Sequence, residues 1–346
     1  FLLLLDIIDG YEQSGGYVAG YFDSTHMYQT SHSNEAAMLF MDVHPGDPSS
    51  LESFCTVIAH ELQHLINFSH RDSPQNTWIN EGLSLAAEYI YGGEQITQRI
   101  NYFNTKNTTI PYGNNFFIWD GYWERQYGDV LANYATAYLF FRWLGIQAGG
   151  NEIYTAIATS PDTDYRAITG AAGSFIDSDF SQWKTLLSTW MLANYYQQNT
   201  GILGYKNELK DTSQKKVPLQ VYTISSADSS VRLFPGEGVF SAIPSGGSVS
   251  YTPAGNINYV GLPSSGSPVV AAPYSGKDLL SFNGNTNEQG GSEIGYVASI
   301  SPGTGGMGRS SVDRNKLDIG GAPRGNYPVD FREMAKKNRS GAFNVP

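Results

Sequence analysis

The sequence predicts an α+β fold, in which an N-terminal sheet leads into a helical region and then into a smaller β-rich segment. Strand-like patterns dominate up to about residue 45, and helical periodicity dominates from about residue 51 to residue 198. After about Gly204 the composition shifts to Gly, Ser, Pro and Val in short alternating runs with turn signals. A chain of 346 residues is long for a single core, so we expect more than one unit.

These shifts place the expected divisions at residues 1–203, 204–303 and 304–346. The second part reads as a small β-sandwich or barrel, and the third as a basic, glycine-rich tail. The opening segment, residues 1–10, is predicted to be a buried strand and not a signal peptide. It lacks a basic start and has acidic residues in place of a small-residue cleavage site.

Individual elements follow from the spacing of apolar residues. A strand is predicted at 36–43, apolar on both faces, and the aromatic, asparagine-rich segment 98–128 is predicted to be a loop, either beside a cleft or packed on the surface. Helices are predicted at 51–68, 79–91, 130–144, 152–158 and 179–197.

Composition and charge limit the possible partners and location. A net charge of −11 and a pI near 4.9 argue against nucleic acid or an anionic membrane as a partner. No run of apolar residues is long enough for a transmembrane span. The single cysteine, Cys55, excludes an intrachain disulfide and reads as a small core residue. An acidic, lysine-poor chain fits a secreted or cell-surface bacterial protein.

The predicted helix 51–68 contains the sequence His-Glu-Leu-Gln-His from His60 to His64. Because residues four apart lie on one helix face, both imidazoles can be aimed at a single cation. Glu61 then lies beside the cation, where a carboxylate can take a proton from bound water and return it to a leaving amine. The alternative is a structural helix with hydrogen-bonded core histidines, but its apolar frame makes such buried polar groups costly.

A catalytic zinc needs a third protein ligand and an open fourth position. Glu81, in Trp-Ile-Asn-Glu-Gly-Leu-Ser at the start of the predicted helix 79–91, is the candidate, and 16 residues separate it from His64. That is enough for a turn and a returning helix. The alternative is a carboxylate that interacts only with the positive end of the helix dipole.

The pairing of these two segments resembles the gluzincin metallopeptidases, and most closely the hyicolysin-type bacterial neutral metallopeptidases, over about residues 1–200. The resemblance implies a zincin-like catalytic domain, one zinc held by His60, His64 and Glu81, and Glu61 as general base. It also implies Glu88 as a carboxylate that orients a ligand histidine, since Glu88 lies two turns after Glu81 on the same face. Otherwise Glu88 is a solvated helix position.

The aminopeptidase branch of this clan supplies a tyrosine hydroxyl to the oxyanion from a helix that corresponds to 130–144. Tyr134 matches that position, and Tyr138, one turn later, is the substitute. The chain has 23 tyrosines, so ordinary packing is the alternative for either. The spacing to Glu81 is shorter than in that branch, and the Gly-x-Met-Glu-Asn segment that binds a free amino terminus is missing.

The sequence therefore predicts a secreted zinc endopeptidase acting on protein or peptide substrates. An extended substrate is expected to pair with a sheet edge, for which strand 36–43 is the best candidate. Because this strand is apolar on both faces, the equal alternative is a plain core strand. The alternatives are a zinc aminopeptidase with the same site, or a non-catalytic surface-binding protein with a vestigial metal site. The β-rich segment is a candidate for contact with a surface or substrate, and the sequence gives no indication for or against calcium.

Overall fold

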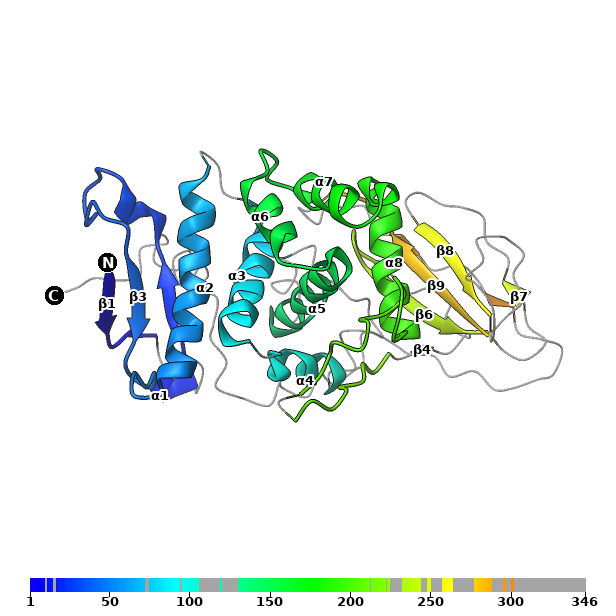
Figure 1. Cartoon of the computed structure of the whole chain (residues 1–346), viewed down its shortest axis with the longest axis horizontal. Coiled ribbons are helices and arrows are strands. Elements are labelled where there is room, and N and C mark those ends of the chain that lie inside the picture. Colours follow the sequence, from blue (N-terminus) through cyan, green and yellow to red (C-terminus); the bar gives the residue numbers. More distant parts are fainter. Residues whose placement is uncertain are drawn as a thin grey trace. The chain divides into compact units, whose positions relative to one another are not determined.

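The computed structural model combines helices with several small sheets, in agreement with the α+β class (Figure 1). It describes residues 1–9, 11–14, 17–71, 75–93, 95–105, 119, 130–211, 213–221, 223–224, 232–243, 248–249, 257–263, 277–287, 295–296 and 300–301. Within these residues, no helix is long and apolar enough to cross a membrane.

The N-terminal elements are β1 (Leu2–Leu5), α1 (Tyr11–Ser14), β2 (Gly20–Phe22), the 3₁₀ helix η1 (Ser24–Met27), β3 (Leu39–Asp42) and α2 (Leu51–Ser69). The helices that follow are α3 (Thr77–Gly92), α4 (Thr97–Thr105), α5 (Val130–Ala148), α6 (Glu152–Thr159), α7 (Tyr165–Phe175), the 3₁₀ helix η3 (Ser178–Ser181) and α8 (Trp183–Tyr196). The late strands are β4 (Thr223–Ile224), β5 (Arg232–Leu233), β6 (Gly238–Ala242), β7 (Ser248–Val249), β8 (Ile257–Leu262), β9 (Asp278–Asn283), β10 (Gly295–Tyr296) and β11 (Ile300–Ser301).

The chain divides into two compact units, which share helix α3. The N-terminal unit contains Phe1–Pro74 together with Ala87–Gly93, and the second unit contains Gln75–Ala86 and the chain from Glu94. The predicted boundary between residues 203 and 204 falls inside the second unit, so the three-part division stays a prediction. The tail 304–346 lies outside the described residues.

The N-terminal unit is a three-stranded sheet in the order β1-β3-β2, with α2 alongside it (Figure 1). β3 pairs in parallel with β1 and antiparallel with β2. Phe22 of β2 meets Phe68 of α2 with ring centroids 5.7 Å apart, whereas on the other face Tyr21 stacks on Phe40 at 4.5 Å. The contact between Phe22 and Phe68 packs α2 on one face of the sheet.

Two predictions for this sheet were wrong. The strand predicted at 36–43 is β3, but it pairs on both sides and is therefore the middle strand and not an edge. The opening segment does form a strand, β1, yet it is not buried: Leu2, Leu3 and Leu4 are 48%, 40% and 49% exposed. β1 has a neighbour on one side only in the described sheet, so its leucines are covered less than those of a central strand.

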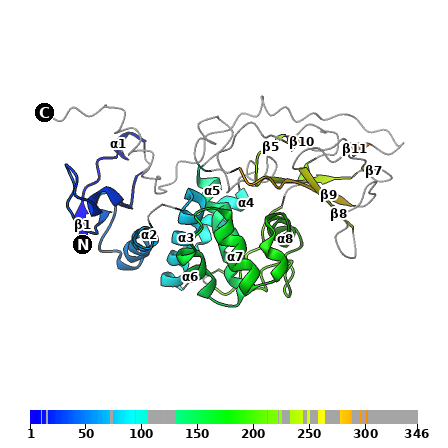
Figure 2. The ribbon, with the colours of Figure 1, turned by 90° about the horizontal axis from the view of Figure 1, so that it is seen from above.

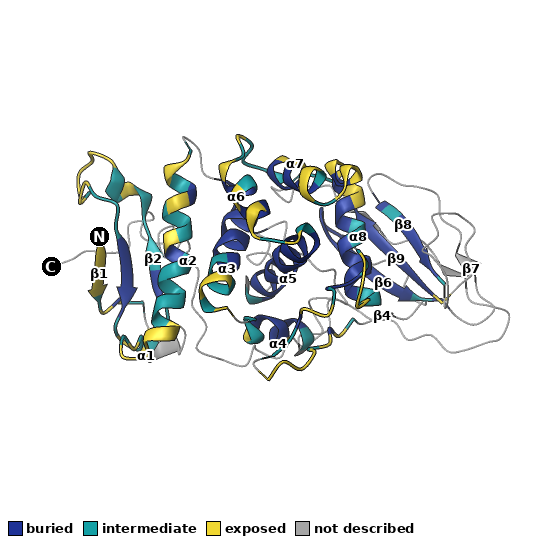
Figure 3. Ribbon diagram, in the orientation of Figure 1, coloured by how far each residue is buried: buried dark blue, intermediate teal, exposed yellow. Residues whose placement is uncertain are grey.

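Helix α5 forms the core of the second unit, and its middle turns are almost completely buried (Figure 3). Phe140 packs against Trp190 with ring centroids 5.3 Å apart and against Trp78 of α3 at 6.2 Å. Two helices of this unit, α4 and α7, were not predicted, and the predicted helix 179–197 is divided into η3 and α8. The other predicted helices agree with the structure to within a few residues at each end.

The late strands of the second unit form a sheet in the order β4-β6-β9-β8, with small two-stranded pairs β10-β5 and β11-β7. Helix α8 lies against one face of this sheet (Figure 2). Tyr195 of α8 stacks on Phe240 of β6 with ring centroids 5.1 Å apart, and its hydroxyl donates to Asp278 of β9. The β-rich segment thus packs on a helix of the same unit.

Gly82 allows α3 and α5 to approach closely within the second unit. A Cβ atom at this position would lie 2.1 Å from Cε2 of Phe141. Phe141 is itself completely buried, so its ring has no free space into which to move. The glycine that follows Glu81 in the sequence is therefore required by the packing of the core.

We expect Gly82→Ala to lower the free energy of unfolding by about 1–3 kcal/mol, because the added methyl group overpacks the contact with Phe141. Thermal unfolding followed by circular dichroism measures this. Gly92→Ala is the matched control, since no atom lies within 4 Å of a Cβ built at the last residue of the same helix. The control should be neutral or slightly stabilising, and equal loss in both variants would contradict the packing argument.

Candidate metal centre

Helix α2 brings His60 and His64 together. The two residues are one helical turn apart, and their ring centroids lie 4.9 Å from each other at an interplanar angle of 78°. Both histidines are partly buried, and Glu61, between them, is only 7% exposed. The helix geometry predicted from the sequence is therefore present in the structure.

Helix α3 adds the third candidate ligand, Glu81. The first ten residues of α3, Thr77–Ala86, are all buried, and Glu81 is 2% exposed. One ligand atom from each of His60, His64 and Glu81 lies within 4.8 Å of the others. We call these three residues the ligand trio. Two imidazoles and one carboxylate match the ligand set of catalytic zinc sites, which keep a fourth position open.

Glu88 contacts the trio through His60. Oε1 of Glu88 accepts a hydrogen bond from Nδ1 of His60 at 2.6 Å, and both side chains are largely buried, at 15% and 12% exposed. A proton on Nδ1 leaves Nε2 with its lone pair, which is the atom that a metal ion binds. The structure thus brings Glu88 to the place where a carboxylate fixes the tautomer and direction of a ligand histidine.

Tyr134 lies on α5 and is 6% exposed. Its ring lies under the guanidinium group of Arg99, with Cζ 4.7 Å from the ring centroid, and Trp119 meets it edge-on at 4.9 Å. Neither of these contacts involves the ligand trio. The role of Tyr134 as a donor to the oxyanion stays a prediction.

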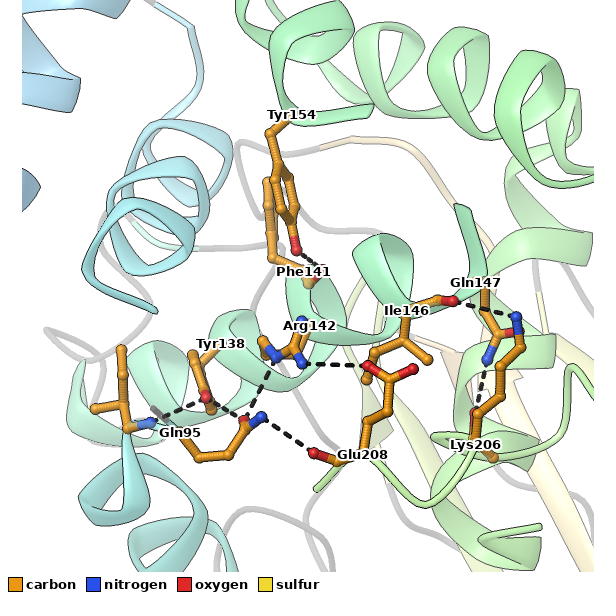
Figure 4. A network of polar contacts seen from close by, with 11 residues as sticks. Gln95, Tyr138, Phe141, Arg142, Ile146, Gln147, Tyr154, Lys206 and Glu208 are labelled. Carbon is orange, nitrogen blue, oxygen red and sulfur yellow. Dashed lines mark hydrogen bonds and ion pairs between the residues drawn. The ribbon is translucent and has the colours of Figure 1, made fainter. Parts of the chain in front are cut away.

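Tyr138, the substitute for Tyr134, has a different use for its hydroxyl group (Figure 4). The hydroxyl accepts a hydrogen bond from the backbone N–H of Ile96 at 3.0 Å and donates one to Oε1 of Gln95 at 2.5 Å. Gln95 also accepts from Nε of Arg142 at 3.4 Å. Tyr138 is completely buried, and its hydroxyl joins the segment before α4 to α5. These contacts favour a structural role.

Arg99, which contacts Tyr134, is a residue that sequence reasoning missed. It lies on α4, inside the segment 98–128 that was predicted to be a loop. A signal was present, because Ile96, Ile100 and Phe103 recur at helical spacing, and Ile100 and Phe103 are completely buried. The remainder of that predicted loop, apart from Trp119, lies outside the described residues from 106 to 129.

The site defines a class: an α+β protein with a His-Glu-x-x-His helix and a glutamate from the next helix as the third candidate metal ligand. Among curated proteins, the chain is similar to the neutral metalloprotease ShpI of Staphylococcus hyicus, with 29% identity over 216 residues. The match covers 59% of this chain and 48% of the relative, so the chain spans about half the length of that protein. No protein-family model matches the chain. The resemblance to the bacterial neutral metallopeptidases is confirmed by this relative.

Glu88→Gln is expected to weaken zinc binding by about 10- to 100-fold, because an amide is a poorer acceptor for the Nδ1 proton of His60. Competition with a chromophoric zinc chelator measures the affinity. Glu52→Gln removes an exposed carboxylate from the first turn of α2 and is the matched control. Equal zinc affinities in the two variants would show that Glu88 does not contribute to zinc binding.

Tyr138→Phe is expected to reduce stability by about 1–3 kcal/mol, since the N–H of Ile96 loses its acceptor and Oε1 of Gln95 loses one of its two donors. Chemical denaturation of the wild type and the variant measures the difference. Tyr91→Phe, which alters an exposed tyrosine at the end of α3, serves as the comparison. An unchanged midpoint in Tyr138→Phe would contradict the structural role.

Proposed function

We propose that this chain is a zinc-dependent peptidase, and more specifically an endopeptidase of gluzincin type. The observation that carries the proposal is the ligand trio, with the carboxylate of Glu61 next to one of its members on α2. The similarity to a neutral metalloprotease supports the same activity. A zincin-like arrangement of residues 1–203 and secretion from a bacterial cell are parts of the proposal.

In the proposed mechanism, His60, His64 and Glu81 hold zinc. When bound, zinc lowers the pKa of a water molecule to about 7 and polarises the scissile carbonyl group. The carboxylate of Glu61 accepts a proton from the attacking water and passes it to the leaving amine. Because Glu61 is 7% exposed, bulk water has little access to that carboxylate.

The supporting residues act on geometry and charge. Glu88 accepts a hydrogen bond from Nδ1 of His60, so that Nε2 of this imidazole would be the nitrogen that holds zinc. Tyr134 is proposed to donate its hydroxyl to the oxygen that gains negative charge as the scissile carbonyl is attacked. A donor prepositioned in this way favours the transition state over the bound substrate.

The edge for an extended peptide is reassigned to β2. β3 is the middle strand, whereas β2 has a neighbour on one side only in the described sheet and packs against α2 through Phe22 and Phe68. A peptide that adds to β2 would run beside the helix that carries the histidines. Substrate contacts by the β-rich segment, from residue 204 to residue 303, remain part of the proposal.

Glu61→Gln is expected to keep zinc and the fold but to lose nearly all turnover, because only the proton acceptor is removed. Zinc content by atomic emission and cleavage of an internally quenched peptide blocked at both ends are the measurements. Glu81→Ala is the companion variant and should lose zinc. Full activity of Glu61→Gln would refute its role as the base.

The same peptides separate the proposal from its alternatives. Cleavage of blocked peptides by the wild type identifies an endopeptidase, and cleavage only of peptides with a free amino terminus identifies an aminopeptidase. Stoichiometric zinc without cleavage of either kind identifies a non-catalytic binding protein.

Tyr134→Phe is expected to lower kcat by about 10²-fold with unchanged zinc content, as expected for loss of one donor to the oxyanion. Tyr138→Phe is the informative comparison, since its hydroxyl is used by Gln95 and Ile96. Steady-state kinetics below the unfolding temperature of each variant measures the effect. If only Tyr138→Phe lowers kcat, the donor to the oxyanion is Tyr138, one helical turn later, and not Tyr134.

A further inference from the structure

Two arginines of the second unit are almost completely buried, and they differ in how their charge is balanced. Arg99 of α4 is 8% exposed and Arg142 of α5 is 4% exposed. A guanidinium group carries its charge at every physiological pH, so it must be stabilised where it lies.

Arg142 has a counter-charge within the protein (Figure 4). One of its Nη atoms lies 3.8 Å from a carboxylate oxygen of Glu208, and its Nε donates to Oε1 of Gln95 at 3.4 Å. Gln95 in turn donates to the backbone carbonyl of Glu208 at 3.2 Å. These contacts place one negative charge beside Arg142 and tie the segment before α4 to α5.

Arg99 has a different environment. Its guanidinium lies over the ring of Tyr134, with Cζ 4.7 Å from the centroid, and Trp119 closes the edge of that ring. Among the described residues, no carboxylate lies within ion-pair distance of Arg99. A cation–π contact stabilises a guanidinium only in part, and it acts through the face of the group and not through the five N–H donors in its plane.

We infer that Arg99 and Tyr134 form a carboxylate-binding subsite for a peptide ligand. A carboxylate in the plane of the guanidinium would accept two parallel hydrogen bonds, while the Tyr134 ring holds the group from one side. The chain as a whole carries a net charge of −11, so the positive charge of Arg99 is opposite in sign to that of the chain. The carboxylate has two possible sources, an Asp or Glu side chain of the substrate or its free C-terminus.

This inference rests on the proposed peptidase function, because it assigns part of the substrate. It predicts that peptides with a correctly placed carboxylate bind better than matched peptides with an amide. Glu61→Gln is the background for the binding measurement, because it is expected to hold peptides without cleaving them.

The experiment measures the binding of labelled peptides to Glu61→Gln by fluorescence anisotropy. One set replaces Gln by Glu at each position in turn around the cleavage site, and a second set compares a free C-terminus with a C-terminal amide. We expect one carboxylate to tighten binding by about tenfold or more, as for hydrogen bonds to a charged group. The set in which this occurs identifies the source of the carboxylate.

Adding Arg99→Gln should reduce the ratio between carboxylate and amide peptides to about one, and Arg99→Lys should retain part of it. Arg99→Met keeps the stem that packs on Tyr134 and should also abolish the ratio, so it replaces Arg99→Gln if that variant does not fold. Arg166→Gln, which removes an exposed arginine with a side chain 60% exposed, should leave the ratio unchanged.

Two outcomes would overturn the inference: no carboxylate peptide binds more tightly than its amide, or the preference survives Arg99→Gln and Arg99→Met. Cleavage of amide peptides by the wild type tests the peptidase function separately. Cleavage without a carboxylate preference rejects the subsite alone. A preference in binding without cleavage by the wild type supports the subsite and rejects the peptidase.

Discussion

The candidate metal centre depends on the spacing of two glutamates along one helix. Glu81 and Glu88 are seven residues apart on α3, which places them about 10 Å from each other along the axis, on the same face. The first belongs to the ligand trio and the second accepts the Nδ1 proton of His60. A single helix therefore carries both one candidate ligand and the carboxylate that accepts a hydrogen bond from another candidate ligand.

The parts of the site that depend on helix geometry could be predicted from the sequence. The spacing of His60 and His64 fixes their common face, and Glu88 could be placed two turns after Glu81 by the same rule. Tyr138 could not be separated from Tyr134 in this way, because both lie on the same face of α5. The hydroxyl partners that distinguish them come from Gln95 and Ile96, more than forty positions earlier in the chain.

The errors in the predicted fold also arise where the structure depends on contacts between segments that are distant in the sequence. The order β1-β3-β2 decides which strand is an edge, and strand order is a matter of pairing between segments and not of local pattern. Helix α7 is rich in Gly, Ala, Ser and Thr, and α4 is largely polar, so their intrinsic signals are weak. Both helices owe their formation to burial of a few residues, among them Ile168 and Phe103, against the second unit.

The close contact at Gly82 ties the chemistry of the site to the hydrophobic core. Glu81 is the residue immediately before this glycine, so the packing of α3 on α5 also affects the position of a candidate ligand. A metal ion that binds only the folded chain adds its binding free energy to the free energy of folding. Through Gly82, the packing of the aromatic core and the affinity for the metal ion would thus be thermodynamically linked. Substitutions that accumulate in the core and loosen its packing would therefore also weaken metal binding.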